Sequence, residues 1–163
     1  LPISILLGLG SRYAGALAKR IGTRIMLIAG PATTGVGYVV LALTVDAGGY
    51  WLALFPGLII IGLGMTATVA PLTTAVFDAA PDDAGGTASG INNAASRVGG
   101  LIAVAALGFA FGGSDLSTLP PEALRASYRW IMVAAACLAF ASALAAAATI
   151  GVGKGRALET PST

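Results

Sequence analysis

The amino-acid sequence predicts an all-α, polytopic membrane protein with four complete transmembrane helices and the end of a fifth. Hydrophobic residues make up 56% of the 163 residues and charged residues only 10%, whereas soluble domains carry roughly 25% charge. Four long segments contain no Asp, Glu or Lys, and Arg97 is the one Arg inside them. About 20 apolar residues suffice to cross a bilayer. We therefore expect spans at residues 25–44, 51–77, 85–111 and 130–150.

The first element precedes these spans. Residues 1–9 are apolar but too few to cross a bilayer, and no basic leading region of a signal peptide stands before them. We interpret them as the end of a helix that begins in a part of the protein absent from this sequence. The chain is then the C-terminal part of a longer protein.

Local signals place the ends of the later elements. Pro71 should bend the span at 51–77, because it removes one backbone hydrogen bond. Pro120, Pro121 and Glu122 are typical of a helix start and predict a short amphipathic helix that runs into the last span. Residues 1–150 are thus a partial transmembrane domain, and residues 151–163 form a polar tail.

The distribution of basic residues predicts the topology. The connection before the first complete span and the tail together carry six Lys or Arg, whereas the connection at 112–129 carries only Arg125 and Arg129. The positive-inside rule places the first connection and the C-terminus in the cytoplasm. Tyr50-Trp51 and Tyr128-Trp130 then share the outer face, where aromatic rings settle at head-group level. We expect the protein in the plasma membrane, the inner membrane in a bacterium.

The composition argues against several function classes. The sequence has no His and a single Cys, so we expect no metal site, no cofactor, no catalytic residue and no enzyme activity. A formal charge of +2 is too small to indicate nucleic-acid binding. All seven acidic residues lie in connections or the tail. Any membrane-embedded carboxylate that couples transport to protons would have to lie in the absent N-terminal part.

The clearest motif is Gly-Ala-Leu-Ala-Lys-Arg-Ile-Gly-Thr-Arg at residues 15–24. It resembles the Gly-x-Leu-Ala-Asp-Arg-x-Gly-x-Arg signature of the major facilitator superfamily, which implies a cytoplasmic loop that takes part in gating. Its key positions are Gly15, Lys19, Arg20, Gly22 and Arg24. Lys19 stands where the family usually has Asp, which leaves the charge relay served by that Asp in question. The alternative is a generic basic loop that obeys the topology rule.

A second, longer resemblance covers residues 66–107. Its Ala-Gly-Gly-Thr-Ala-Ser-Gly-Ile-Asn-Asn run at 84–93 and its Arg-Val-Gly-Gly at 97–100 are similar to late helices of the fourteen-span drug:proton antiporter branch of that superfamily. The resemblance implies that the spans at 51–77 and 85–111 line a central cavity. Those at 25–44 and 130–150 would then face lipid.

Polar residues within the inferred cavity helices are the candidate site. Ser89, Asn93 and Arg97 recur every four residues and share one helix face, with Asn92 beside them. An ionisable residue within a span marks a functional site by default, although Arg97 could instead anchor the helix by snorkelling to the interface. The complete set of cavity or gating candidates is Thr66, Pro71, Ser89, Asn92, Asn93 and Arg97.

Together these observations predict the C-terminal fragment of a secondary active transporter. We expect proton-coupled efflux of small amphipathic or drug-like compounds by alternating access. Its partners are the lipid bilayer, a small-molecule substrate, protons and the N-terminal half of the same chain. Two alternatives remain: a permease of the same fold that imports a sugar or metabolite, and a stand-alone four-span membrane protein with an interaction role.

Overall fold

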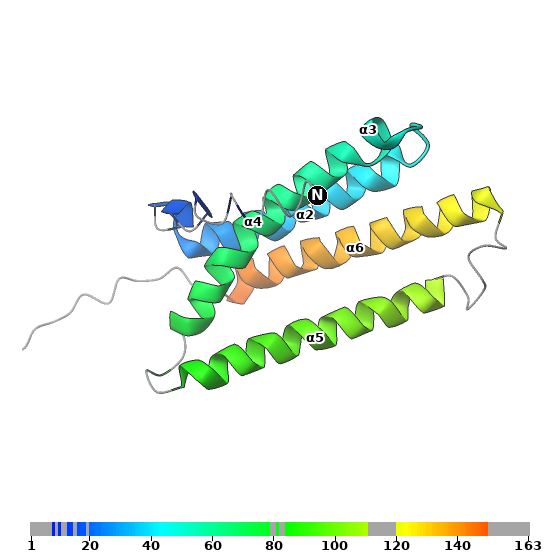
Figure 1. The fold of residues 1–163 in the computed structure, drawn as a ribbon. Helices are drawn as coiled ribbons and strands as arrows, with labels where there is room; N and C mark the ends of the chain where they lie inside the picture. The colour runs from blue at the N-terminus through cyan, green and yellow to red at the C-terminus, as the bar shows by residue number, and fades with distance from the viewer. Residues whose placement is uncertain are drawn as a thin grey trace, which may run out of the picture.

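A computed structural model describes residues 8, 10, 13, 14, 16–18, 20–78, 81, 84–110 and 120–149. Its elements are α2 (Thr23–Thr44), α3 (Tyr50–Ala53), α4 (Phe55–Asp78), α5 (Gly85–Ala110) and α6 (Pro121–Thr149). No strand occurs within these described ranges, which confirms the all-α fold class. Figure 1 shows α2, α4 and α6 side by side, with α5 below them.

Helix α2 is the centre of the bundle, since it packs along both α4 and α6. Its contact with α4 depends on glycines that let the two backbones approach. A Cβ atom built on Gly37 would lie 3.0 Å from the Gly57 carbonyl oxygen, and one on Gly64 would lie 2.7 Å from the Gly30 carbonyl oxygen. Such small-residue seams are how membrane helices associate without a hydrophobic driving force.

The α2–α6 contact uses a different device. Gly35 lies against the ring of Phe140, whose nearest carbons would stand 3.0 Å from a Cβ atom at position 35. Ala42 of α2 and Ala136 and Ala143 of α6 are also buried. A flat patch on α2 thus accepts an aromatic ring and small side chains from α6.

Helix α4 bends as the sequence predicts. Pro71 lies inside this helix and is fully buried, and its ring nitrogen cannot donate to the carbonyl of Ala67. Figure 1 shows the first half of α4 running beside α2 and its second half turning away toward the start of α5. The bend therefore carries the α4–α5 connection away from the bundle.

Helix α5 is set apart, because it touches α4 and α6 only sparsely. Cβ atoms built on Gly86, Gly90, Gly99 and Gly100 would meet nothing within 4 Å in the described structure. Among the described residues, three helical stretches are long and apolar enough to cross a membrane: Thr23–Thr44, Tyr50–Val76 and Pro121–Thr149. Helix α5 has 26 residues, about 39 Å, but its first half is too polar to join that set.

The segment before α2 differs from the predicted loop. Residues 16–18, 20 and 21 are helical, and only Gly22 breaks the helix before α2 begins at Thr23. Gly22 has a φ of 93°, a conformation that side chains disfavour. Ala, Leu and Arg are strong helix formers, so the described residues of the basic motif before Gly22 are helical rather than a loop. Ala14 and Ala18, one turn apart, pack with Met26 in a small core.

Candidate functional site

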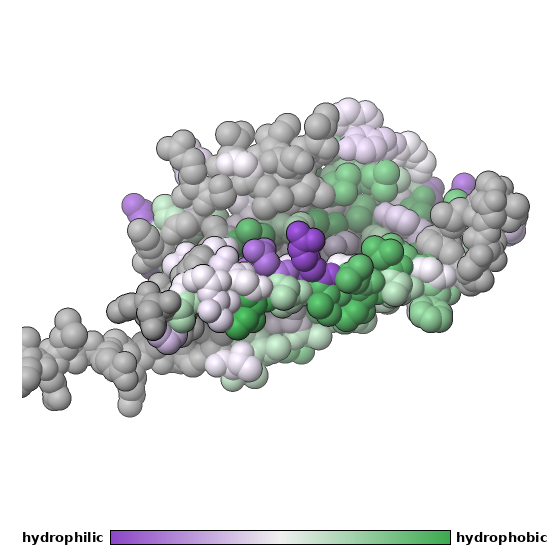
Figure 2. Space-filling view, turned by 60° about the horizontal axis from the view of Figure 1, so that its bottom comes forward, coloured by the Kyte–Doolittle hydropathy of each residue, from purple (hydrophilic) through white to green (hydrophobic). Residues whose placement is uncertain are grey.

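The polar residues of α5 form an exposed row. Ser89, Asn93 and Arg97 lie at successive four-residue steps on the helix, and both Asn93 and Arg97 are exposed. Arg97 is 12 residues from the start of α5 and 13 from its end, roughly 18–20 Å from either terminus. This central position weakens the snorkelling alternative, because a side chain cannot reach an interface over that distance. Figure 2 shows a compact hydrophilic patch flanked by hydrophobic residues on this side of the molecule.

A shallow hollow of about 500 Å³ lies between the end of α4 and the first half of α5. Val76 lines it from α4, and Ala88, Asn92 and Ala95 line it from α5. Arg97 is two residues beyond Ala95, which is about 200° around a helix. The arginine therefore lies on the side of α5 opposite the hollow, whereas Asn92 faces it. The structure does not bring these two residues into one pocket.

The two α4 candidates lie inside the bundle. Thr66 is 8% exposed, and its hydroxyl donates to the Gly62 carbonyl over 2.7 Å. It also contacts Gly10 of the first helical segment, since a Cβ atom there would lie 2.5 Å from the Thr66 methyl group. Pro71 is fully buried. Neither residue lines the described hollows, so in this structure both belong to the packing and the bend of α4.

A second hollow was not predicted from the sequence. It has a volume of about 570 Å³ and lies between α5 and α6. Alanines line it on both helices, Ala103 and Ala106 on α5 and Ala134 and Ala135 on α6, together with the larger residues Leu107, Trp130, Ile131, Met132 and Leu138. Tyr38 of α2 also borders it. The alanine-rich composition of both helices was its only trace in the sequence.

Of the five key positions of the basic motif, the structure describes Arg20, Gly22 and Arg24, while Gly15 and Lys19 lie outside the described residues. Arg20 is exposed. Arg24 reaches across the bundle, and its Nη2 donates to the Ala147 carbonyl oxygen over 3.0 Å. Ala147 lies in the last turn of α6, where carbonyls have no partner within their own helix. The guanidinium thus caps the negative end of α6.

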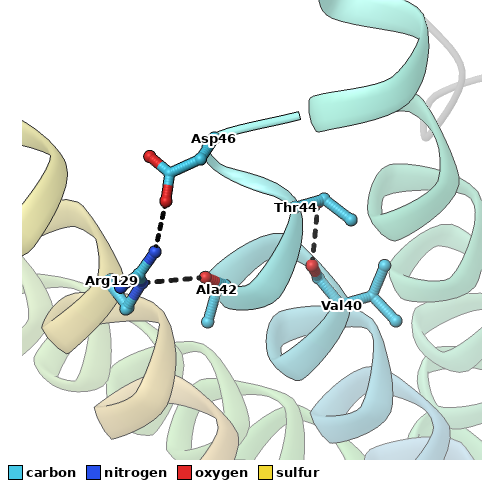
Figure 3. A network of polar contacts seen from close by, with 5 residues as sticks. All are labelled: Val40, Ala42, Thr44, Asp46 and Arg129. Atoms are coloured by element: carbon cyan, nitrogen blue, oxygen red, sulfur yellow. Dashed lines mark hydrogen bonds and ion pairs between the residues drawn. The ribbon is translucent and has the colours of Figure 1, made fainter. Parts of the chain in front are cut away.

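A matching contact occurs at the other end of the same helix pair. Arg129 of α6 donates from Nε to the Ala42 carbonyl oxygen over 3.2 Å and from Nη2 to the Asp46 carboxylate over 2.6 Å (Figure 3). Ala42 lies in the last turn of α2. In the sequence, Arg129 contributes only to the assignment of topology. Nothing in the sequence indicates that Arg129 and Asp46 pair, because 83 positions separate them.

Aromatic residues gather at this same end of the bundle. The rings of Tyr50 and Trp51 meet edge to face at 5.7 Å, and Trp51 lies 4.9 Å from the ring of Phe55. Trp130 follows Arg129 and is 74% exposed. Both aromatic clusters therefore lie at one end of the bundle, which agrees with the prediction that they share one membrane face.

Comparison with known proteins identifies the family. The Major Facilitator Superfamily model matches residues 3–161, which is nearly the whole chain. The chain belongs to the major facilitator superfamily. The family and the long apolar helices indicate an integral membrane protein, as the sequence predicts.

Two named relatives belong to mycobacteria. Over 126 residues the chain is 31% identical to "Multidrug resistance protein Stp" of Mycobacterium tuberculosis, which covers 77% of this chain and 23% of that protein. Over 113 residues it is 35% identical to "Triacylglyceride transporter" of Mycolicibacterium smegmatis, which covers 64% of this chain and 20% of that protein. The chain thus spans about a quarter or less of the curated relatives it matches. No solved structure matches it significantly.

Proposed function

We propose that this superfamily member exports small amphipathic or drug-like compounds and that a proton gradient drives the export. The relatives named for multidrug resistance and for triacylglyceride transport support this substrate class. One name indicates resistance to several drugs and the other transport of a lipid. The fourteen-span drug:proton antiporter branch, which residues 66–107 resemble, fits the same proposal.

The exposed row on α5 is the observation that carries the proposal. Helices α4 and α6 each pack closely along α2, whereas α5 touches its neighbours only sparsely and leaves Asn93 and Arg97 exposed. Within the described residues, no hydrogen bond or ion pair engages the Arg97 side chain. A charged residue halfway along such a helix is costly against lipid. We therefore place this face of α5 against the aqueous substrate cavity.

Proton coupling requires a carboxylate within a membrane span. The acidic residues of this chain lie at helix ends, in connections or in the tail. Asp46 lies in the turn after α2, and Glu122 lies in the first turn of α6. The remaining acids follow the same pattern in the sequence, at helix ends, in connections or in the tail. The proposal therefore assigns the coupling carboxylate to the rest of the transporter, with this chain supplying one cavity wall.

The test uses the full-length transporter in intact cells loaded with neutral, cationic and anionic fluorescent amphiphiles. We expect energy-dependent dye efflux that stops when a protonophore collapses the proton gradient. Arg97→Ala should reduce efflux per molecule of transporter several-fold. Leu43→Ala, at a 75% exposed position on α2, is the matched control and should leave efflux unchanged. Unaltered efflux in Arg97→Ala, or dye uptake in place of efflux, would contradict the proposal.

A further inference from the structure

The face of α5 that carries Arg97 changes character along its length. Toward the start of the helix it presents the uncharged polar residues Ser89 and Asn93. Toward the other end, Leu101 and Val104 follow Arg97 by four and seven residues, and so continue the same face. They are 70% and 67% exposed. A cation therefore stands at the junction of a polar half and an apolar half.

The charge of this face has no counterpart in the described structure. Arg129 pairs with Asp46, and Arg24 caps the end of α6. Arg97 makes no such contact with any described residue. Guanidinium groups favour carboxylate and phosphate partners, because they offer a planar fork of donors. The complementary molecule is thus an anion.

We infer that Arg97 binds the anionic head group of an amphipathic substrate whose hydrocarbon tail lies along Leu101 and Val104. The inference rests on the proposed function and names its substrate class: monoanionic amphiphiles with a carboxylate or phosphate head. From Arg97 to the end of α5 at Ala110 the helix rises roughly 20 Å. That length accommodates an extended alkyl tail beside the apolar half. Asn93, one turn before Arg97, supplies an amide donor to the same head group.

The experiment compares tail-matched probes on the purified full-length transporter in nanodiscs of zwitterionic lipid, with the signal of empty discs subtracted. The probes are 11-(dansylamino)undecanoate, its uncharged methyl ester and the corresponding trimethylammonium cation. We expect the carboxylate to bind about ten- to hundred-fold more tightly than the ester, the range of a charge-assisted hydrogen bond. Arg97→Gln should remove this preference, and Arg97→Lys should retain part of it. Arg125→Gln, which removes an exposed cation of α6, should keep it.

Two results would overturn the inference. Equal affinity of the wild-type protein for the carboxylate and the ester would show that the charge of the head group does not contribute to binding. A preference that survives in Arg97→Gln would assign the anion to another residue. Transport separates these failures from failure of the proposed function. If Arg97→Gln lowers the efflux of all three probes equally, Arg97 serves the transport cycle by pairing with a carboxylate of the protein, and only the substrate class is wrong.

Discussion

Replacing Gly64 with Ala tests the glycine seam between α2 and α4. The added Cβ atom would lie 2.6 Å from the Thr34 amide nitrogen and 2.7 Å from the Gly30 carbonyl oxygen, and it would also strike the Thr34 hydroxyl. Ordinary contact begins at 3.4 Å. Because two of these neighbours are backbone atoms, no side-chain rotation relieves the contact. The helices have to separate locally by roughly 0.8 Å in a tightly packed region.

Overpacking of this kind costs about 1–3 kcal/mol. At roughly 2 °C per kcal/mol, the apparent Tm of the solubilised full-length transporter should fall by about 2–6 °C. The assay is the fraction of protein that stays monodisperse after heating. Gly90→Ala is the matched control, because it adds the same methyl group where nothing described lies within 4 Å. Its apparent Tm should stay at or slightly above the wild-type value, since Ala is the better helix former.

Equal apparent Tm values for Gly64→Ala and the wild type would refute the steric reasoning. They would mean that α2 and α4 are not held at this separation in the transporter. A fall of the same size in Gly90→Ala would refute it in another way. Loss of stability would then follow any added methyl group rather than the close backbone approach at Gly64.

Three further predictions concern the helix ends. Arg129→Gln should lower the apparent Tm more than Asp46→Asn does. Asp46→Asn removes only the exposed ion pair, which is worth under about 1 kcal/mol, whereas Arg129→Gln also removes the hydrogen bond to the Ala42 carbonyl. Equal changes in apparent Tm would exclude a contribution from that hydrogen bond. Arg24→Ala should speed amide hydrogen exchange in the last turn of α6 and leave exchange in its first turn unchanged, because the variant lacks the hydrogen bond to the Ala147 carbonyl. The same change in exchange rate along the whole of α6 would contradict this contact. In a Cys137→Ala background, single cysteines introduced at Ala47 and at Ser114, which lies outside the described residues, should react with an impermeant thiol reagent added outside intact cells. Labelling of Thr23→Cys from that side would show that the predicted topology is inverted.

The extents of the helices could largely be predicted from the sequence. The apolar run at 85–111 corresponds to Gly85–Ala110, and that at 25–44 to Thr23–Thr44. The predicted helix start at Pro120, Pro121 and Glu122 is confirmed, since α6 begins at Pro121 and continues without a break to Thr149 in the span predicted at 130–150. The run at 51–77 contains a break at Leu54, because Pro56 has no N–H to offer the Leu52 carbonyl.

The arrangement of the candidate site could be predicted only in part. A four-residue spacing is sufficient to align Ser89, Asn93 and Arg97, since it depends on helix geometry alone. The buried positions of Thr66 and Pro71 depend on which face of α4 meets its neighbours, and both faces of that helix are similarly apolar. The two arginine caps depend on pairing between distant helices. A sequence shows a cation near each interface but not the carbonyl that it reaches.

The two arginine caps tie α2 to α6 at both ends, whereas no such contact holds α5 in the described part of the chain. Arg24 and Ala42 on α2 are 18 residues apart, as are Arg129 and Ala147 on α6, so two antiparallel helices bring each guanidinium to the other's last turn. The spacing corresponds to about 27 Å, close to the thickness of the hydrocarbon core, and it places each charge near an interface where it costs little. A slide of α6 along α2 would break both caps at once. Because no comparable contact among the described residues ties α5 to α4 or α6, relative movement within this part of the transporter should occur at α5, the helix that carries Arg97.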